Sequence, residues 1–314
     1  MQASAGSTTA PTGVAAVRQT LTGLVHLTKP ELTLMVVITT MLGLHLGSHG
    51  NLPWALVGWT LLGTGLSGGG ACGMNMALEH EADAQMRRTA KRPIPSGHVS
   101  PLAAFGFSLA LLFLGNALLW MKANPLTAML SMLAAAVYVL LYTPLKRSTP
   151  LATWVGAIPG ALPPMMGFTA VRGTIEPVAV IIFGILFFWQ LPHFWALAFM
   201  YRDDYARGGF KVQPTPGAHF DPARLESHIL WATVTLVAVS VLLFVRGDAG
   251  WIYLCGALGA GGLFLYRAIV LHRSHKVTDA RRLFFMSIIY QPVLVAALVL
   301  DKPQALLRAF GISI

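Results

Sequence analysis

The chain alternates long apolar runs with short polar connections. Runs that contain no Asp, Glu, Lys or Arg lie at 32–78, 93–121, 123–145, 148–171, 177–201, 227–245, 249–266 and 283–300. A helix needs about 20 apolar residues to cross a bilayer. Each run can therefore supply one crossing, and the first can supply two because a polar stretch at 47–53 divides it. The pattern predicts nine transmembrane helices.

The composition supports an integral membrane protein. The chain is 55% hydrophobic and 11% charged, with a mean hydropathy of +0.64. Because lipid offers no partner to peptide groups, a chain crosses a membrane as helices or as a closed barrel. The two-residue alternation typical of barrel strands is absent from this sequence. We expect an all-α membrane fold.

The first residues differ from the rest. Residues 1–20 are rich in Ser, Thr and Ala and nearly uncharged, and they lack the basic start and apolar core of a signal peptide. We expect a disordered tail over 1–20 and a single membrane domain over 21–314.

The basic residues predict the orientation in the membrane. With nine crossings, 17 of the 22 Lys and Arg residues fall on the side that holds the N-terminus, and five fall on the other. Cytoplasmic loops carry the excess of positive charge. We therefore expect a multi-pass protein of the inner (plasma) membrane, with a cytoplasmic N-terminus and the C-terminus on the opposite side. The pI of about 10 follows from this topology and requires no nucleic-acid partner.

Two clusters of acids, within 79–83 and at 203–204, follow the second and sixth predicted helices. Asn75, Glu79 and Asp83 are spaced by four residues, so they share one helix face. Mg²⁺ takes oxygen ligands, typically one or two carboxylates together with substrate phosphates. The simpler interpretation is a solvated helix end whose acids pair with nearby basic residues.

Basic residues close to both clusters favour a diphosphate site. Arg88 and Arg92 follow the first cluster, and the stretch YTPLKRST adds Lys146 and Arg147. Carboxylates for a metal, with Arg and Lys for phosphate oxygens, are the groups that bind a diphosphate. The alternative for Lys146 and Arg147 is that they extend from a helix end towards water.

One histidine lies inside an apolar run. His193 is in the run 177–201, where an imidazole is costly unless it has a partner or a function. It is a candidate functional residue, and a hydrogen-bonded core histidine is the alternative.

Four stretches carry a resemblance to a known family. They are NMALEHEADAQMRRTAKRPIPSG (75–97), YTPLKRSTPLATWVGAIPGALPPMMGF (142–168), WQLPHFWALAFMYRDDYARGGF (189–210) and ARRLFFMSIIY (280–290). The first resembles the signature of the UbiA superfamily of intramembrane prenyltransferases. The LKRST and LPHFWALA stretches resemble its protohaem IX farnesyltransferase (haem O synthase) branch. The adjacent acids at 203–204 depart from the spaced DxxxD that is common in the superfamily.

The resemblance implies a fold and an activity. The fold would be a UbiA-type bundle of nine helices around a central cavity that opens near the cytoplasmic face. The activity would be transfer of a farnesyl group from farnesyl diphosphate to the vinyl group of haem B, giving haem O for terminal oxidase assembly. Mg²⁺ would be the cofactor, the bilayer the environment, and the downstream haem A synthase a partner.

The resemblance also implies roles for particular residues. Those implied as catalytic are Asn75, Glu79, Asp83 and Asp204. The implied metal ligands are Asn75, Glu79, Asp83, Asp203 and Asp204. The implied diphosphate ligands are Arg88, Arg92, Lys146, Arg147 and Tyr205. His193 is added as a candidate haem contact because of its position in the apolar run.

Other functions fit parts of the pattern. A related prenyltransferase could act on a quinone precursor or another aromatic acceptor, and a non-enzymatic haem chaperone would need haem contacts without a metal–diphosphate cluster. A transporter would also place ionisable groups in the membrane. However, transporter sites lie near the midplane, whereas these acids lie at helix ends.

Overall fold

The computed structural model describes residues 13–48, 52–211 and 222–301, and every regular element in these ranges is a helix. The first half of the chain forms α1 (Gly13–Leu27), α2 (Pro30–Gly47), α3 (Trp54–Leu78), α4 (His80–Gln85), α5 (Pro101–Lys122), α6 (Pro125–Ala136), the π-helix η1 (Val137–Tyr142) and α7 (Thr143–Ser148). The second half forms α8 (Ala152–Arg172), α9 (Pro177–Met200), α10 (Arg202–Arg207), α11 (Pro222–Val245), α12 (Trp251–Ser274) and α13 (Val277–Asp301). The all-α expectation is confirmed.

Local sequence signals explain where several helices begin and end. Proline lies in the first turn of α2, α5, α6 and α9, where its missing N–H would have had no partner in the helix. The side chains of Ser100 and Asn124 accept the backbone N–H groups of Ala103 and Thr127 and so cap α5 and α6. Gly173 ends α8 with a φ of 70°, in the left-handed region that glycine enters without strain.

The predicted membrane-spanning runs all fall on helices. Within the described ranges, seven helical segments are long and apolar enough to cross a bilayer, and α1 and α2 count together as one of them. The other two predicted runs correspond to α3 and α8. The run in α3 contains the glycine-rich LSGGGACG, and α8 contains three prolines, so both have a lower hydropathy than a typical spanning segment.

Glycines in α3 and α5 allow these two helices to pack closely. A Cβ on Gly70 would lie 2.5 Å from the carbonyl oxygen of Ser108, and one on Gly115 would lie 2.5 Å from the carbonyl oxygen of Gly63. Both distances are shorter than any side chain tolerates, so only glycine fits. The glycine-rich stretch at 66–73 therefore serves helix packing.

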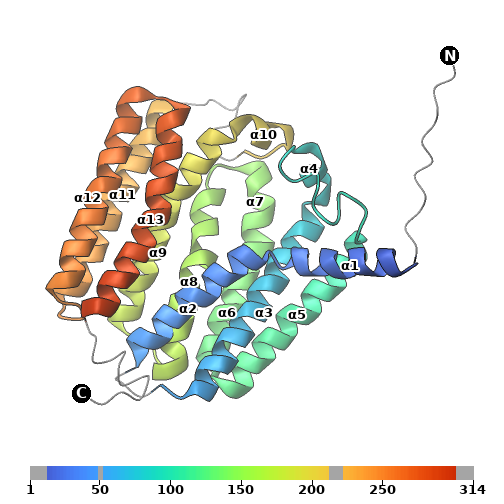
Figure 1. Cartoon of the computed structure of the whole chain (residues 1–314), viewed down its shortest axis with the longest axis horizontal. Helices are drawn as coiled ribbons and strands as arrows, with labels where there is room; N and C mark the ends of the chain where they lie inside the picture. Colours follow the sequence, from blue (N-terminus) through green and yellow to red (C-terminus); the bar gives the residue numbers. More distant parts are fainter. Residues whose placement is uncertain (1–12, 49–51, 212–221, 302–314) are drawn as a thin grey trace.

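The arrangement places both acidic clusters at one end of the bundle. In Figure 1, α11, α12 and α13 form one side of the molecule and α3 and α5 the other, with α8 and α9 between them. The short helices α4 and α10, which carry the acids, lie at the same end as the connection between α12 and α13 (Figure 1). The connection between α11 and α12 lies at the opposite end.

The N-terminal region differs from the expectation. Residues 13–20, assigned from the sequence to a disordered tail, form the first half of α1, and residues 1–12 lie outside the described residues. Figure 1 shows α1 projecting sideways from the bundle. The chain turns from α1 into α2 at Lys29, whose φ of 45° is in the left-handed region.

Candidate active site

The acidic residues of the first cluster lie where α3 gives way to α4. The helix is interrupted at Glu79, but the Glu79 N–H still bonds to the Asn75 carbonyl at 3.0 Å and the Asp83 N–H to the Glu79 carbonyl at 2.9 Å. The four-residue repeat therefore continues through the break, and the three side chains keep a common face. Asn75, Glu79 and Asp83 are 1%, 3% and 1% exposed. Such burial excludes a solvated helix end.

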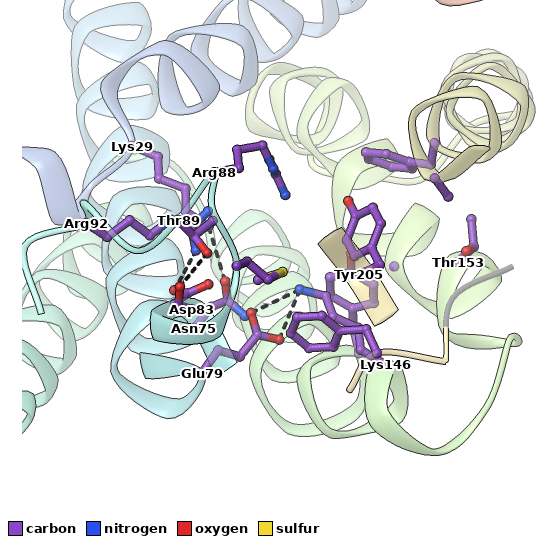
Figure 2. A pocket seen from close by; sticks show the side chains of 16 residues that line it. Lys29, Asn75, Glu79, Asp83, Arg88, Thr89, Arg92, Lys146, Thr153 and Tyr205 are labelled. Carbon is purple, nitrogen blue, oxygen red and sulfur yellow. Dashed lines mark hydrogen bonds and ion pairs between the residues drawn. The ribbon is translucent and has the colours of Figure 1, made fainter. Parts of the chain in front are cut away.

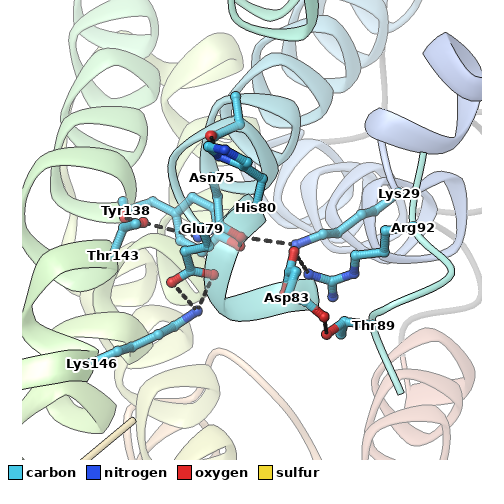
Figure 3. Close-up of polar contacts among 11 residues, drawn as sticks. Lys29, Asn75, Glu79, His80, Asp83, Thr89, Arg92, Tyr138, Thr143 and Lys146 are labelled. Atoms are coloured by element: carbon cyan, nitrogen blue, oxygen red, sulfur yellow. Dashed lines mark hydrogen bonds and ion pairs between the residues drawn. The ribbon is translucent and has the colours of Figure 1, made fainter. Parts of the chain in front are cut away.

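Each of these side chains contacts a basic residue from another part of the chain (Figure 3). Lys146 Nζ lies 3.0 Å from Glu79 Oε1 and 3.1 Å from Glu79 Oε2. Arg92 donates a 2.6 Å hydrogen bond to Asp83 Oδ2. The predicted acids and two of the predicted phosphate-binding residues, Arg92 and Lys146, therefore meet in space, although 67 residues separate Lys146 from Glu79 in the sequence.

The orientation of the Asn75 amide follows from its neighbours. Thr143 Oγ1 donates its proton to the Tyr138 carbonyl at 2.8 Å, so it can only accept from Asn75 Nδ2, which lies 3.0 Å away. The Asn75 oxygen consequently faces the opposite way. It accepts from Lys29 Nζ at 3.1 Å and from the Tyr138 hydroxyl at 3.4 Å.

The π-helix η1 lies opposite the acids. Tyr138 and Tyr142 stack with ring centroids 5.5 Å apart, and Lys146 Nζ lies 4.4 Å from the Tyr142 ring centroid. A Cβ on Gly156 would lie 2.5 Å from this ring, so α8 leaves room for it by having glycine there. Single π-helical turns recur at functional sites, and this one directs two tyrosines towards Asn75 and Lys146.

These groups line a cavity with one charged wall and one apolar wall (Figure 2). Its lining residues are Lys29, Asn75, Glu79, Asp83, Met86, Arg88, Thr89, Arg92, Tyr142, Lys146, Thr153, Gly156, Phe194, Ala198, Tyr205 and Phe210. Arg88 lies over the Tyr201 and Tyr205 rings, at 5.6 and 5.8 Å from their centroids. The cavity can therefore accept a molecule with an anionic head and an apolar body.

Of the second acidic cluster, Asp204 is buried but has other partners. Its carboxylate accepts the backbone N–H groups of Arg87 at 3.2 Å and Arg88 at 3.3 Å, and it pairs with the side chain of Arg207. Desolvation by burial opposes its ionisation, but the hydrogen bonds from Arg207, Arg88 and Arg87 outweigh that effect and lower the pKa of Asp204. Asp204 thus fixes the loop that carries Arg88 and is not among the cavity-lining residues.

Two further predicted ligands lie outside the cavity. The side chain of Asp203 is 76% exposed and pairs with Arg202 at 3.8 Å. Arg147 is exposed, and it does not line the cavity although its neighbour Lys146 does. Adjacent residues on a helix point in different directions. Lys146 therefore faces the cavity and Asp204 faces the loop beside it, whereas Arg147 and Asp203 face solvent.

His193 lies on α9 against α13. Its Nδ1 is 2.7 Å from Ser287 Oγ, and Ser287 donates its own proton to the Phe284 carbonyl at 2.6 Å. His193 must therefore carry its proton on Nδ1, which leaves the lone pair on Nε2. The imidazole stacks between Trp189 and Phe284, with ring centroids 5.1 and 4.7 Å away. It is partly buried and does not line the charged cavity.

The donor set fits Mg²⁺ together with a diphosphate. Asp83 Oδ1 is buried and has no hydrogen-bond partner, an arrangement that costs free energy unless a cation completes it. Within the described ranges, no group of three or more His, Cys, Asp and Glu residues is arranged to hold a metal. Two carboxylates and one carboxamide nevertheless suffice for Mg²⁺, because phosphate oxygens and water fill its remaining positions. The predicted set of five protein ligands is not gathered.

The sequence reasoning missed several residues in and beside the cavity. Lys29 and Tyr142 line it, and Tyr138 and Thr143 contact Asn75. They come from the α1–α2 turn and from η1 and α7, and none belongs to a cluster of charge. For Lys29, a signal was present in the Lys-Pro pair that starts the first apolar run. For the tyrosines, the four-residue spacing of Tyr138, Tyr142 and Lys146 repeats that of the acids.

Comparison with known families and proteins agrees with this geometry. The model of the UbiA prenyltransferase family matches residues 36–289. "Protoheme IX farnesyltransferase 1" of Pseudomonas fluorescens (strain Pf0-1) is 39% identical over 278 residues, which is 88% of this chain and 92% of that protein. "Protoheme IX farnesyltransferase" of Salinibacter ruber is 41% identical over 275 residues, which is 88% of this chain and 96% of that protein.

Solved structures share the fold at low sequence identity. A structure of digeranylgeranylglyceryl phosphate synthase superposes with a TM-score of 0.76 at 18% identity and covers 90% of this chain and 98% of that one. A UbiA homolog from Archaeoglobus fulgidus bound to GPP and Mg²⁺ gives a TM-score of 0.63 at 16% identity, covering 88% and 99%. The helical bundle is therefore the fold of these proteins.

Proposed function

Because this chain belongs to the UbiA prenyltransferase family, we propose that it transfers the farnesyl group of farnesyl diphosphate to a vinyl group of haem B. Diphosphate leaves, a C–C bond forms to one vinyl carbon, and water adds to the other with loss of a proton, giving the hydroxyethylfarnesyl chain of haem O. The observation that carries the proposal is the identity of about 40% to protoheme IX farnesyltransferases over 88% of the chain. The amphipathic cavity supports it independently, because its charged wall suits a diphosphate and its apolar wall suits an isoprenoid chain.

The chemical problem is to break the allylic C–O bond while negative charge accumulates on the diphosphate. Groups that bind this developing charge stabilise the transition state more than the ground state. Mg²⁺, when bound, supplies part of this stabilisation, and Glu79, Asp83 and the Asn75 oxygen would hold it. Lys146, Arg92 and Arg88 would bind phosphate oxygens.

The apolar wall protects the allylic cation from water. Met86, Phe194, Ala198 and Phe210 line the cavity beside the charged groups. A farnesyl cation that forms among such side chains has the vinyl group as its available nucleophile, provided water is excluded until the new C–C bond has formed.

His193 is proposed as the contact to haem. Its Nδ1 proton is committed to Ser287, so the Nε2 lone pair can bind the haem iron or accept a hydrogen bond. The flanking rings of Trp189 and Phe284 offer an aromatic surface to a flat acceptor.

The membrane placement is part of the proposal. The chain would cross the inner membrane nine times, through the seven segments with spanning character together with α3 and α8, with the N-terminus in the cytoplasm. The acidic end of the bundle would then face the cytoplasm, and the product would pass to haem A synthase.

The test is the haem content of membranes. Membranes from a strain that lacks its own haem O synthase should contain haem B alone, and expression of this chain should convert part of it to a farnesylated haem identified by mass spectrometry. Unchanged haem B, with the protein present and folded, would contradict the proposal. Farnesylation of an added aromatic acid instead would assign the quinone-precursor activity.

A further inference from the structure

Lys29 brings an additional positive charge into the cavity from a part of the chain that the known motifs do not include. It lies in the turn between α1 and α2 and lines the cavity. Its ammonium group donates to Asn75 Oδ1 at 3.1 Å. Figure 3 shows it approaching the acids from the side opposite Lys146.

The partner of Lys29 distinguishes it from the other basic residues of this wall. Lys146 and Arg92 are each paired with a carboxylate, Glu79 and Asp83, at 3.0 and 2.6 Å. Lys29 contacts a neutral carboxamide instead, and no ion pair joins it to a carboxylate among the described residues. Burying an ammonium group without an ion-paired carboxylate costs free energy, and binding an anion would offset that cost.

The backbone around Lys29 is held in an unfavourable conformation. A left-handed φ of 45° is uncommon for a residue with a side chain. The turn is fixed on both sides, because Thr28 Oγ1 donates to the Val25 carbonyl at 2.8 Å and Thr33 Oγ1 to the Thr28 carbonyl at 2.6 Å. Pro30 then begins α2. The chain therefore keeps Lys29 directed into the cavity at a conformational cost.

From this geometry we propose that Lys29 is a diphosphate ligand of the prenyl donor, and that its ammonium leaves Asn75 Oδ1 for a phosphate oxygen when the donor binds with Mg²⁺. The proposal rests on the function proposed above. It adds a residue from the α1–α2 turn to the basic residues Arg88, Arg92 and Lys146, which come from α7 and from the loop after α4.

The exchange has a consequence for the metal. Asn75 Oδ1 is the oxygen proposed to bind Mg²⁺, and in the structure the Lys29 ammonium bonds to it. The Lys29 ammonium and Mg²⁺ would therefore compete for Asn75 Oδ1. Both are attracted to phosphate oxygens, so the donor can bind both at once. Removal of the Lys29 charge should therefore weaken donor binding without weakening the binding of Mg²⁺ alone.

The experiment compares Lys29→Met, Lys29→Arg and Lys122→Met as purified full-length proteins. Met keeps the length of the side chain and removes its charge, and Arg keeps the charge. Lys122 ends α5, is exposed and lies over the Trp59 ring at 5.7 Å, so it is a matched control away from the cavity. Three quantities are measured without haem: affinity for farnesyl diphosphate at saturating Mg²⁺, affinity for Mg²⁺ alone, and the thermal midpoint.

We expect Lys29→Met to weaken farnesyl diphosphate binding by about tenfold to a hundredfold, the range for losing one charge-assisted hydrogen bond. Affinity for Mg²⁺ alone should be unchanged or tighter, Lys29→Arg should recover most of the donor affinity, and Lys122→Met should match the wild type. Donor affinity that is unchanged in Lys29→Met overturns the assignment. So does a parallel loss of donor affinity, Mg²⁺ affinity and thermal stability in both Lys29 variants, because that pattern indicates a structural role.

The wild-type protein separates this proposal from the proposed function. A wild-type chain that binds no farnesyl diphosphate contradicts both. Normal wild-type binding together with equal binding by Lys29→Met overturns the Lys29 assignment and leaves the proposed function intact.

Discussion

The two acidic clusters each follow a long apolar helix, but their side chains lie in different environments. In the first, Asn75, Glu79 and Asp83 are all buried and line a cavity opposite basic side chains. In the second, Asp203 faces solvent, and Asp204 accepts backbone N–H groups of the loop that carries Arg88. Spacing explains the difference, because residues four apart share a helix face and adjacent residues do not.

The comparison assigns different functions to the clusters. In the proposed function, the first cluster would hold the metal that binds the diphosphate, through Glu79 at the start of α4 and Asp83 within it. The second cluster fixes a loop beside the cavity, and α10 contributes Tyr205 to the lining and the support for Arg88. Substitutions in the two clusters should change different quantities.

The largest effect is expected at Asp83. Asp83→Asn removes the charge whose buried Oδ1 has no protein partner, so the Mg²⁺–diphosphate complex loses a ligand that acts in the transition state. We expect a loss of rate on the order of 10²–10⁴ with a folded protein, measured as haem O formed per protein. Near-normal turnover would mean that the first cluster is a structural helix end.

A smaller and selective effect is expected at His193, which lies outside both clusters. His193→Ala should weaken haem B binding by about tenfold or more and leave Mg²⁺-dependent farnesyl diphosphate binding nearly unchanged, because its contacts are to α13. Both affinities are measured on the purified variant. Equal loss of both substrates, or of neither, would exclude a haem contact and favour a packing role.

At Asp204 we expect a moderate effect on donor affinity. Asp204→Asn retains the size of the side chain but cannot accept two backbone N–H groups and pair with Arg207 as the carboxylate does. The loop that carries Arg88 should loosen, and the KM for farnesyl diphosphate should rise by about tenfold with a smaller change in kcat. A large fall in kcat at saturating donor would indicate direct participation in the reaction.

The smallest effect is expected at Asp203. Its side chain is 76% exposed and its pairing with Arg202 is long, at 3.8 Å, and an exposed ion pair contributes about 0–1 kcal/mol. Asp203→Asn should therefore keep kcat and KM within about twofold of the wild type. If Asp203→Asn instead raises the KM for farnesyl diphosphate as Asp204→Asn does, both acids of the second cluster support the loop. The assignment of Asp203 as a solvent-exposed residue without a role would then be wrong.

Much of the fold could be predicted from the sequence because lipid imposes a simple rule on apolar runs. All eight apolar runs fall on helices in the part of the chain that the structure describes, although α3 and α8 have a lower hydropathy because glycine and proline replace larger apolar residues there. Residues 13–20, which we expected to belong to a tail, are helical in the structure, since α1 begins at Gly13. Arg18 is the one charged residue of this segment, so the sequence gives little signal for a helix there.

The candidate site could be predicted only in part. The four-residue spacing identified Asn75, Glu79 and Asp83, and proximity in the sequence added Arg88 and Arg92. The pairing of Lys146 with Glu79 depends on how α3 packs beside η1, which leads directly into α7, and a single sequence does not reveal this packing. For the same reason, the sequence does not show that Arg147 and Asp203 face solvent while their neighbours Lys146 and Asp204 face the protein. Tertiary packing decides which of two adjacent residues faces inward.

The most direct test of the difference between the clusters is the Mg²⁺ dependence of farnesyl transfer in Asp83→Asn and Asp204→Asn. The concentration of Mg²⁺ that gives the half-maximal rate is measured for both variants and the wild type at saturating farnesyl diphosphate and haem B. We predict that it rises by at least about tenfold in Asp83→Asn, which would lose a proposed metal ligand, and stays within about twofold of wild type in Asp204→Asn. An equal rise in both variants would make Asp204 a metal ligand and contradict the separation of the two clusters.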